Sequence, residues 1–352
     1  MKEIVRAPAY DGEMPTLLAP EGDRPEPLSQ APSISIVIAA FEAASTIGAT
    51  IRSVLAQSPS PLEIVVCDDG SSDDIAVAVA EFGENVRLLR IVHGGEAKAK
   101  NAAIEHAVGE FVAVIDADDR FLPGRLAAIQ RVLIERPDLD LITTDAVIEL
   151  NGRVVGRAYN KGNIFAAEAQ RAAILDHNFV FGQVVVRRAT MLRLGGFDPE
   201  IRHTTDWECW IRLILDGGRI GCIDAPLGVY VMHEAAMSAS RQAMYEGRVA
   251  TLTKTLSDSR LSEIELASIR ARILSEKRRT KRAEMRAALI AGDKTVRQIA
   301  RSVFRDSNQP RRERLKAAFT VISPEIASAR MRSHDRSYWV GVGDQRFERS
   351  TK

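Results

Sequence analysis

The fold is decided by the stretch Phe111-Val112-Ala113-Val114-Ile115-Asp116-Ala117-Asp118-Asp119. Its five leading apolar residues are typical of a strand covered on both faces of a parallel sheet, and three carboxylates follow directly. Parallel sheets bind ligands beyond the carboxyl ends of their strands. Asp68 and Asp69 follow a second such run, residues 62–67, in the same way. We therefore expect carboxylates from two neighbouring strands to share one crevice, where a divalent cation would offset their repulsion.

Strand-like and helix-like segments alternate around this stretch. The expected strands are residues 33–39, 62–67, 86–92, 110–115 and 139–143, with helices that begin near Ser45, Asp73, Ala97 and Pro123 between them. This alternation predicts an α/β fold with a mostly parallel sheet and helices on both faces. After about residue 150 the connections become irregular, with strands expected at 154–158, 183–187, 219–223 and 228–232 and a helix at 206–215.

Composition divides the chain of 352 residues into three parts. Residues 1–32 hold six prolines and no apolar period, which predicts a flexible N-terminal arm. Residues 33–240 form the expected catalytic domain, and residues 241–352 form a helical extension. The net charge of +1 conceals an asymmetry, because residues 268–352 hold 22 Lys/Arg against 9 Asp/Glu. An acidic front half is therefore joined to a basic tail.

Three interpretations of the basic tail stay open: a solvated helix face, a surface that docks on the acidic half, or a peripheral contact with anionic lipid. A role in homo-oligomer formation is equally open. Aromatic residues are too sparse in the tail to favour nucleic acid. No apolar run reaches the ~20 residues of a membrane span, and the N-terminus lacks the apolar core of a signal peptide. We expect a cytoplasmic protein whose Cys67, Cys209 and Cys222 are reduced and packed.

The loops exclude two common ways of binding a nucleotide. Residues 38–43 follow the first strand without a glycine, and no phosphate-binding loop ending in Gly-Lys-Ser/Thr occurs in the chain. Carboxylates at strand ends bind a diphosphate only through a bridging hard cation. The sequence therefore predicts Mg²⁺ or Mn²⁺ as the cofactor.

Four motifs in order resemble the family 2 glycosyltransferases of the GT-A fold. They are Ser35-Ile36-Val37-Ile38-Ala39-Ala40-Phe41, Ser53-Val54-Leu55-Ala56-Gln57, Val65-Val66-Cys67-Asp68-Asp69-Gly70-Ser71-Ser72-Asp73 and Asp116-Ala117-Asp118-Asp119. The resemblance runs from about Ser33 to Ser240. It implies an inverting, metal-dependent transferase that uses a nucleotide-diphospho-sugar, with a UDP-sugar as the first candidate. The implied acceptor is a hydroxyl of a glycan, free or lipid-linked.

The resemblance also implies roles for residues on the donor side. Asp69 matches the aspartate that recognises a pyrimidine base, with Ala40 and Phe41 in the loop over that base. Asp118, with Asp116 and Asp119, would hold the metal and the ribose of the donor.

Two motifs depart from the family pattern, and one histidine has two interpretations. The usual Pro-x-Tyr-Asn becomes Ala39-Ala40-Phe41-Glu42, which puts Glu42 at the donor site, and the usual Ala-Arg-Asn becomes Ala99-Lys100-Asn101. Lys100 keeps the positive charge toward the donor but loses the planar fork of arginine. His233 falls where relatives have a histidine near the diphosphate and metal, although a hydrogen-bonded loop residue explains it equally well. Surface loops explain His93 and His203.

Asp206 matches the catalytic base of the family, and helix geometry favours it over Glu208. Residues two apart on a helix point about 200° apart, so both carboxylates cannot face one sugar. Thr205 and Glu208 have the spacing of a capping box, which would direct Glu208 to the helix backbone. We therefore expect Asp206 to be the general base. Trp207 and Trp210 are expected in the core, with an acceptor-stacking platform as the alternative.

Two other classes of protein remain as alternatives. A non-catalytic protein of the same fold could bind sugar nucleotides or glycans, although the retention of Asp69, Asp118 and Asp206 argues against it. A nucleotidyltransferase that makes sugar nucleotides shares the α/β layout. It would carry a glycine-rich loop with basic residues after its first strand, and this chain has none.

Overall fold

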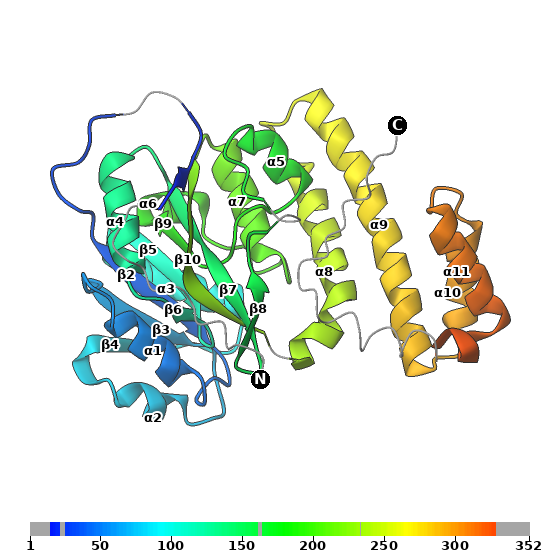
Figure 1. Ribbon diagram of the computed structural model, residues 1–352, viewed down its shortest axis with the longest axis horizontal. Helices are drawn as coiled ribbons and strands as arrows, with labels where there is room; N and C mark the ends of the chain where they lie inside the picture. The colour runs from blue at the N-terminus through cyan, green and yellow to red at the C-terminus, as the bar shows by residue number, and fades with distance from the viewer. Residues whose placement is uncertain (1–14, 22–24, 161–163, 233, 329–352) are drawn as a thin grey trace, which may run out of the picture. The chain divides into compact units, whose positions relative to one another are not determined.

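The computed structural model describes residues 15–21, 25–160, 164–232 and 234–328, without the side chains of 234–241 (Figure 1). Within them the chain forms two compact units. The first contains residues 15–201 and 205–232, and the second contains residues 202–204 and 234–328. The main part of the second unit thus begins at Glu234, seven residues before the predicted start of the helical extension at residue 241.

One ten-stranded mixed sheet organises the first unit, in the order β1-β10-β7-β9-β5-β2-β3-β4, with β6 paired to β10 and β8 to β7. β2, β3, β4 and β5 pair in parallel, as do β7 and β10, whereas β9 runs antiparallel between β5 and β7. The strands are β1 Leu17–Leu18, β2 Ile34–Ala40, β3 Glu63–Asp68, β4 Val86–Arg90, β5 Phe111–Asp116, β6 Arg120–Phe121, β7 Leu141–Leu150, β8 Arg153–Arg157, β9 Val184–Arg187 and β10 Ile220–Met232. The predicted α/β class with a mostly parallel sheet is confirmed.

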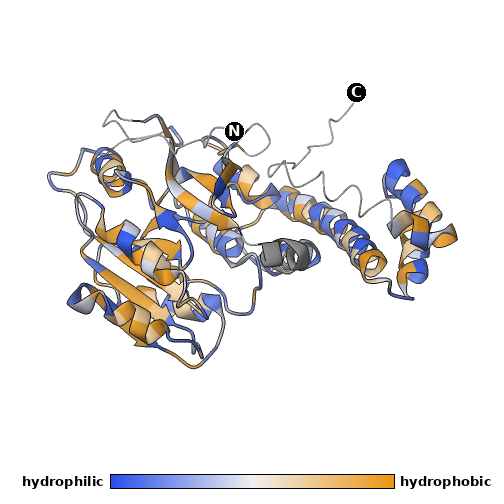
Figure 2. Cartoon of the chain, turned by 60° about the horizontal axis from the view of Figure 1, so that its bottom comes forward, coloured by the Kyte–Doolittle hydropathy of each residue, from blue (hydrophilic) through white to orange (hydrophobic). Residues whose placement is uncertain are grey.

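Helices cover both faces of this sheet, as the continuous apolar strands predict. Ile36 and Ile38 of β2 belong to a core that includes α1 and α4, while Val37 between them is also fully buried and α3 packs on β2. Figure 2 shows the apolar character of these central strands. The helices are α1 Ile47–Leu55, α2 Ile75–Ala80, η1 Gly83–Asn85, α3 Glu96–His106, α4 Arg125–Glu135, α5 Gln170–Asp176, α6 Arg188–Leu194 and α7 Thr205–Leu215.

The register of the parallel strands brings the acidic loops to one edge. Ala39 of β2 lies opposite Cys67 of β3 on one side and Asp116 of β5 on the other. Ala40 then lies opposite Asp68. The carboxyl ends of these three strands therefore meet, which places the 40–42, 69–73 and 117–119 loops side by side.

Three local expectations were wrong. Residues 219–223 and 228–232 form one strand, β10, which continues through irregularities around Pro226. The N-terminal arm is not loose throughout, because Leu17 and Leu18 pair with β10. Finally, β7 extends to Leu150, well beyond the expected strand.

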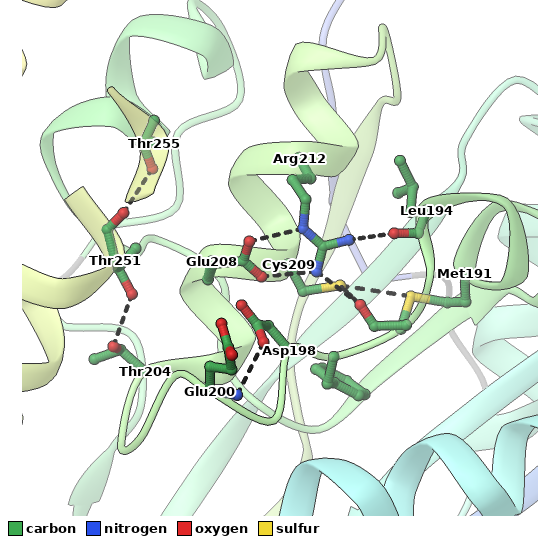
Figure 3. Close-up of polar contacts among 12 residues, drawn as sticks. Met191, Leu194, Asp198, Glu200, Thr204, Glu208, Cys209, Arg212, Thr251 and Thr255 are labelled. Atoms are coloured by element: carbon green, nitrogen blue, oxygen red, sulfur yellow. Dashed lines mark hydrogen bonds and ion pairs between the residues drawn. The ribbon is translucent and has the colours of Figure 1, made fainter. Parts of the chain in front are cut away.

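The second unit is helical, as predicted from Ser240 onward. It contains α8 Glu234–Thr255, α9 Glu263–Ala291, α10 Val296–Arg305 and α11 Arg311–Ile322. Ser262 and Glu265 form the predicted capping box at the start of α9. Thr204 joins this unit through a 2.9 Å hydroxyl contact with Thr251 (Figure 3). Among the described residues, no helix has both the length and the apolar character that a membrane span requires.

Candidate active site

The Asp69 carboxylate, directly after β3, holds the loop that begins α3. Its Oδ1 accepts a hydrogen bond from Gly94 N–H and its Oδ2 from Gly95 N–H, each at 2.8 Å. Gly95 has φ +93°, a conformation that favours glycine. A carboxylate offers about four acceptor positions, so the same buried group can also accept a hydrogen bond from a ligand.

An aromatic pair lies beside Asp69. The rings of Phe41 and His93 have centroids 4.5 Å apart, and Phe41 is about half exposed, while Ala40 before it is buried. His93 Nδ1 is 2.9 Å from Oδ2 of Asp69. His93 is exposed in a surface loop, as expected, and this loop borders the expected base-binding region. An exposed ring next to a buried acceptor suits a planar heterocycle.

Glu42 ties two loops together. It has φ +52°, and its Oε1 accepts hydrogen bonds from the backbone N–H of Ser72 at 2.8 Å and from the Ser72 hydroxyl at 2.9 Å. The Glu42 N–H in turn donates to Ser71 Oγ at 2.9 Å. The departure from the family pattern at this position thus has a structural use, because it connects the loops that follow β2 and β3.

Lys100 lies between two carboxylates at the next strand end. Its Nζ is 2.9 Å from Oδ1 of Asp116, and it also pairs with Glu96 one helical turn earlier. Burial by itself lowers the pKa of Lys100, but Asp116 and Glu96 raise it above the ordinary value, so the ammonium stays charged. The Phe197 ring lies 5.8 Å from Nζ, and Asn101 fixes Phe197 through two backbone hydrogen bonds.

Asp119 is the most deeply buried carboxylate of the Asp116–Asp119 loop. Its Oδ1 accepts from Val231 N–H and its Oδ2 from Gln183 Nε2, both at 2.9 Å. Behind them Arg125 is fully buried, and burial lowers its pKa to about 9. Asp119 therefore connects the acidic loop to β10 and to the residues before β9.

The electrostatics of this loop fit a divalent cation. Burial, followed by the charges of Asp116 and Asp118, raises the pKa of Asp119 well above its ordinary value, although hydrogen bonds from Gln183 and Val231 oppose the rise. Hard carboxylate oxygens are the ligands that Mg²⁺ and Mn²⁺ prefer. Within the described ranges, no three metal-binding side chains come together. The third expected ligand, His233, lies outside the described residues.

Asp206 lies in the first turn of α7, where an asparagine orients it. Asn178 Nδ2 donates to Oδ2 of Asp206 at 2.8 Å, while Asn178 Oδ1 accepts from Val180 N–H at 3.1 Å. Both the nitrogen and the oxygen of the Asn178 amide therefore have hydrogen-bond partners. Burial raises the pKa of Asp206, whereas the charge of Lys100 and the bond from Asn178 lower it. Lys100 thus contacts Asp116 and acts electrostatically on Asp206, which places the expected donor edge near the expected base.

Glu208 binds Arg212, a partner that was not predicted. Both of its carboxylate oxygens accept hydrogen bonds from Arg212, at 2.8 and 2.7 Å (Figure 3). Arg212 also donates to the backbone carbonyls of Leu194 and Gly196. Because both carboxylate oxygens of Glu208 bind Arg212, Asp206 remains the candidate base. Trp207 and Trp210 are buried, which confirms their expected core positions.

Sequence reasoning missed Asn178, His93, Gln183 and Arg125. Their partners lie far away in the chain, 28 residues for Asn178 and 24 for His93, so no local period marks them. The one signal available was the polar character of Asn178 and Gln183 at the two ends of an apolar stretch before β9.

Comparisons with known sequences identify the family. The model of the family described as Glycosyl transferase family 2 matches residues 35–191 of this chain. The Escherichia coli protein named UDP-Glc:alpha-D-GlcNAc-diphosphoundecaprenol beta-1,3-glucosyltransferase WfgD is 33% identical over 192 residues, which cover 52% of this chain and 70% of that protein. The hyaluronan synthase of Pasteurella multocida is 28% identical over 190 residues, 53% of this chain but only 19% of the synthase. This chain therefore matches about a fifth of that much longer protein.

Solved structures agree on the fold. Residues 1–349 of S. aureus TarS in complex with UDP-GlcNAc give a TM-score of 0.56 at 18% identity, covering 86% of this chain and 92% of that one. A mannosyltransferase from Pyrobaculum calidifontis with GDP-Man and Mn²⁺ gives 0.53 at 20% identity, covering 89% and 90%. At these identities the likeness concerns the GT-A fold alone. The sequence match to WfgD, together with the match to the family model, shows that the chain belongs to glycosyl transferase family 2.

Proposed function

We propose that this chain is an inverting glycosyltransferase that moves a sugar from a nucleotide-diphospho-sugar to a hydroxyl of a glycan. One observation carries the proposal. The ammonium of Lys100 contacts Asp116 at the acidic strand edge, and its charge also lowers the pKa of Asp206 at the start of α7. A donor held at the strand edge would thus lie near a carboxylate able to accept a proton.

The proposed nucleotide position is beside Asp69 and Phe41, with Ala40 and Glu42 shaping the loop above it. Asp69 supplies an acceptor for a base N–H, and the exposed Phe41 ring supplies a stacking surface backed by His93. We propose a UDP-sugar as donor, because the name of WfgD contains UDP-Glc and the TarS structure holds UDP-GlcNAc. The GDP-Man bound to the Pyrobaculum protein makes GDP-sugars the second group to test.

We propose that Asp118, with Asp119 and His233, holds Mn²⁺ or Mg²⁺. When bound, the cation would neutralise the diphosphate charge that develops as this group leaves. Asp116, at the start of the same loop, and Lys100, which contacts it from α3, would face the donor. The carboxylate donor set and the pKa of Asp119, raised by burial and by Asp116, support this assignment.

In the proposed reaction, Asp206 accepts the proton of the acceptor hydroxyl. The freed oxygen attacks the anomeric carbon, a new glycosidic bond forms, and the bond from that carbon to the diphosphate oxygen breaks with its electron pair on the leaving group. A single displacement of this kind inverts the anomeric configuration. Asn178 holds the receiving carboxylate in place, because both ends of its own amide are engaged.

The acceptor in this proposal is a glycan hydroxyl, free or attached to a lipid diphosphate. WfgD acts on such a lipid-linked sugar according to its name. The alternative function is a non-catalytic sugar-nucleotide or glycan-binding protein of the same fold.

Thermal unfolding against nucleoside diphosphates and their sugars, with Mn²⁺, Mg²⁺ or EDTA, tests the donor site. A ligand at 100 times its Kd stabilises the native state by about 2.7 kcal/mol, so donors can be ranked directly. We expect a metal-dependent shift with one nucleotide that Asp118→Ala abolishes. Asp206→Asn should keep the shift and lose transfer about 10²- to 10⁴-fold. A nucleotide shift without sugar transfer in the unaltered chain would favour the binding protein.

A further inference from the structure

Helix α11 exposes an apolar stripe to solvent. Leu315, Phe319 and Ile322 are four and three residues apart, which puts them on one face of the helix. Leu315 is 70% exposed, Phe319 39% and Ile322 75%, and Ile326 continues the exposed apolar series beyond the helix end. The face that packs within the unit is a different one, where Ala317 and Thr320 are buried. The stripe is therefore not used to hold the α10–α11 pair together.

Basic side chains border this stripe. At about 100° per residue, Arg311 and Arg312 lie within roughly 70° of the stripe and Lys316 lies on its flank. All three are exposed. Residues 294–322 hold eight Lys/Arg against two Asp/Glu. In Figure 2 the ribbons of these two helices carry both hydrophilic and hydrophobic residues.

The neighbouring helix α10 adds positive charge to the same hairpin. Arg297, Arg301 and Arg305 recur every four residues on α10 and are exposed, so they form one basic row. On the other side of α10, Val296, Ile299 and Val303 are buried. Arg314 ties α11 to α10 by donating to the carbonyl of Phe304 at 2.9 Å. Both helices thus present arginine outward from one packed core.

We propose that the α10–α11 hairpin docks on an anionic phospholipid surface. Leu315, Phe319 and Ile322 would enter the boundary between headgroups and acyl chains, and Arg311 and Arg312 would contact lipid phosphates. Exposed apolar residues bordered by long basic side chains are the pattern of helices that lie in a membrane interface.

Charge and area both disfavour the same hairpin of a second copy as the occupant. That hairpin would bring the same excess of positive charge to the contact. Three or four partly exposed side chains also fall short of the about 800 Å² per partner that a stable protein interface buries. An anionic bilayer supplies an apolar layer and negative charge together, so it matches both features of the hairpin.

Co-sedimentation of the full chain with lipid vesicles tests the proposal without any substrate, so its outcome is independent of the proposed transfer reaction. We expect binding to vesicles of phosphatidylcholine with phosphatidylglycerol, weakened by salt, and little binding to phosphatidylcholine alone. Arg311→Gln with Arg312→Gln should lower partitioning about fivefold per residue. Phe319→Ser with Ile322→Ser should lower it about tenfold per residue.

The matched controls are Ile264→Ser and Arg270→Gln, exposed residues of α9 that should leave partitioning unchanged. Leu315→Ser gives a second apolar variant at an exposed position, where substitution should not disturb folding. Equal partitioning to both kinds of vesicle, or equal losses in controls and hairpin variants, would overturn the proposal. So would a lipid-free dimer that Phe319→Ser abolishes, because the stripe would then be a self-association surface.

Discussion

Asn178 donates a 2.8 Å hydrogen bond to Asp206, and the other end of its amide accepts from the backbone of Val180. The amide therefore cannot turn without losing a bond at each end. Such a donor favours the ionised form of the carboxylate, which is the form that a general base requires. The relationship joins the segment after α5 to the start of α7.

The pH dependence of kcat/KM should follow Asp206. Because burial raises its pKa, activity should fall as pH drops through a value above that of an ordinary aspartate. Asn178→Ala removes a bond that lowers this pKa, so the acidic limb should move to higher pH. Above the limb kcat should drop by about ten- to a hundredfold from poorer positioning. Asn85→Ala, at an exposed turn, should change neither quantity; an unmoved limb in Asn178→Ala would refute the assignment.

Lys100→Met should weaken donor use while keeping the aliphatic stem of the side chain. It removes the cation that contacts Asp116, and we expect donor KM to rise about tenfold, the value of one charge-assisted contact. Lys100→Arg should recover much of the loss. Lys98→Met, exposed on the same helix, is the matched control for steady-state kinetics. A normal donor KM in Lys100→Met would remove this residue from the donor site.

Asp69→Asn should reduce both stability and nucleotide binding. An amide can no longer accept from both Gly94 and Gly95, and an unsatisfied buried N–H costs about 1–3 kcal/mol. For a unit of this size each kcal/mol lowers Tm by about 2–4 °C. Thermal unfolding with and without UDP separates the two effects. Asp74→Asn, exposed and without a capping bond, serves as control; similar shifts in the two variants would contradict the proposed role.

Arg212→Met should destabilise the first unit by about 3–5 kcal/mol, because Glu208 is buried and would lose the guanidinium that binds both its oxygens. Replacing both residues by leucine should cost less than this single change, since no buried carboxylate is then left behind. Arg193→Met breaks a more exposed pair with Asp216 and should cost under about 1 kcal/mol. Chemical denaturation measures all three; equal losses for Arg212 and Arg193 would contradict the expectation.

Several elements of the fold could be predicted from the sequence because they depend on local order. The apolar run before Asp116 specifies a buried strand, and carboxylates that directly follow parallel strands must meet at one edge. The same holds for the capping box at Ser262, whose two side chains are three residues apart. The edges of the sheet were harder, since β1 is only two residues long and forms only against β10.

The sequence by itself therefore determined the α/β class, the acidic strand edge and the candidate base Asp206, because period, spacing and family motifs are properties of short segments. Only the tertiary structure decided the partners of polar side chains that lie far apart in the sequence. Asn178 reaches Asp206 across 28 residues, and Asp69 binds Gly94 across 25 residues. A hydrogen bond is made within about 3 Å, so its existence depends on how whole elements pack together, which no local pattern records.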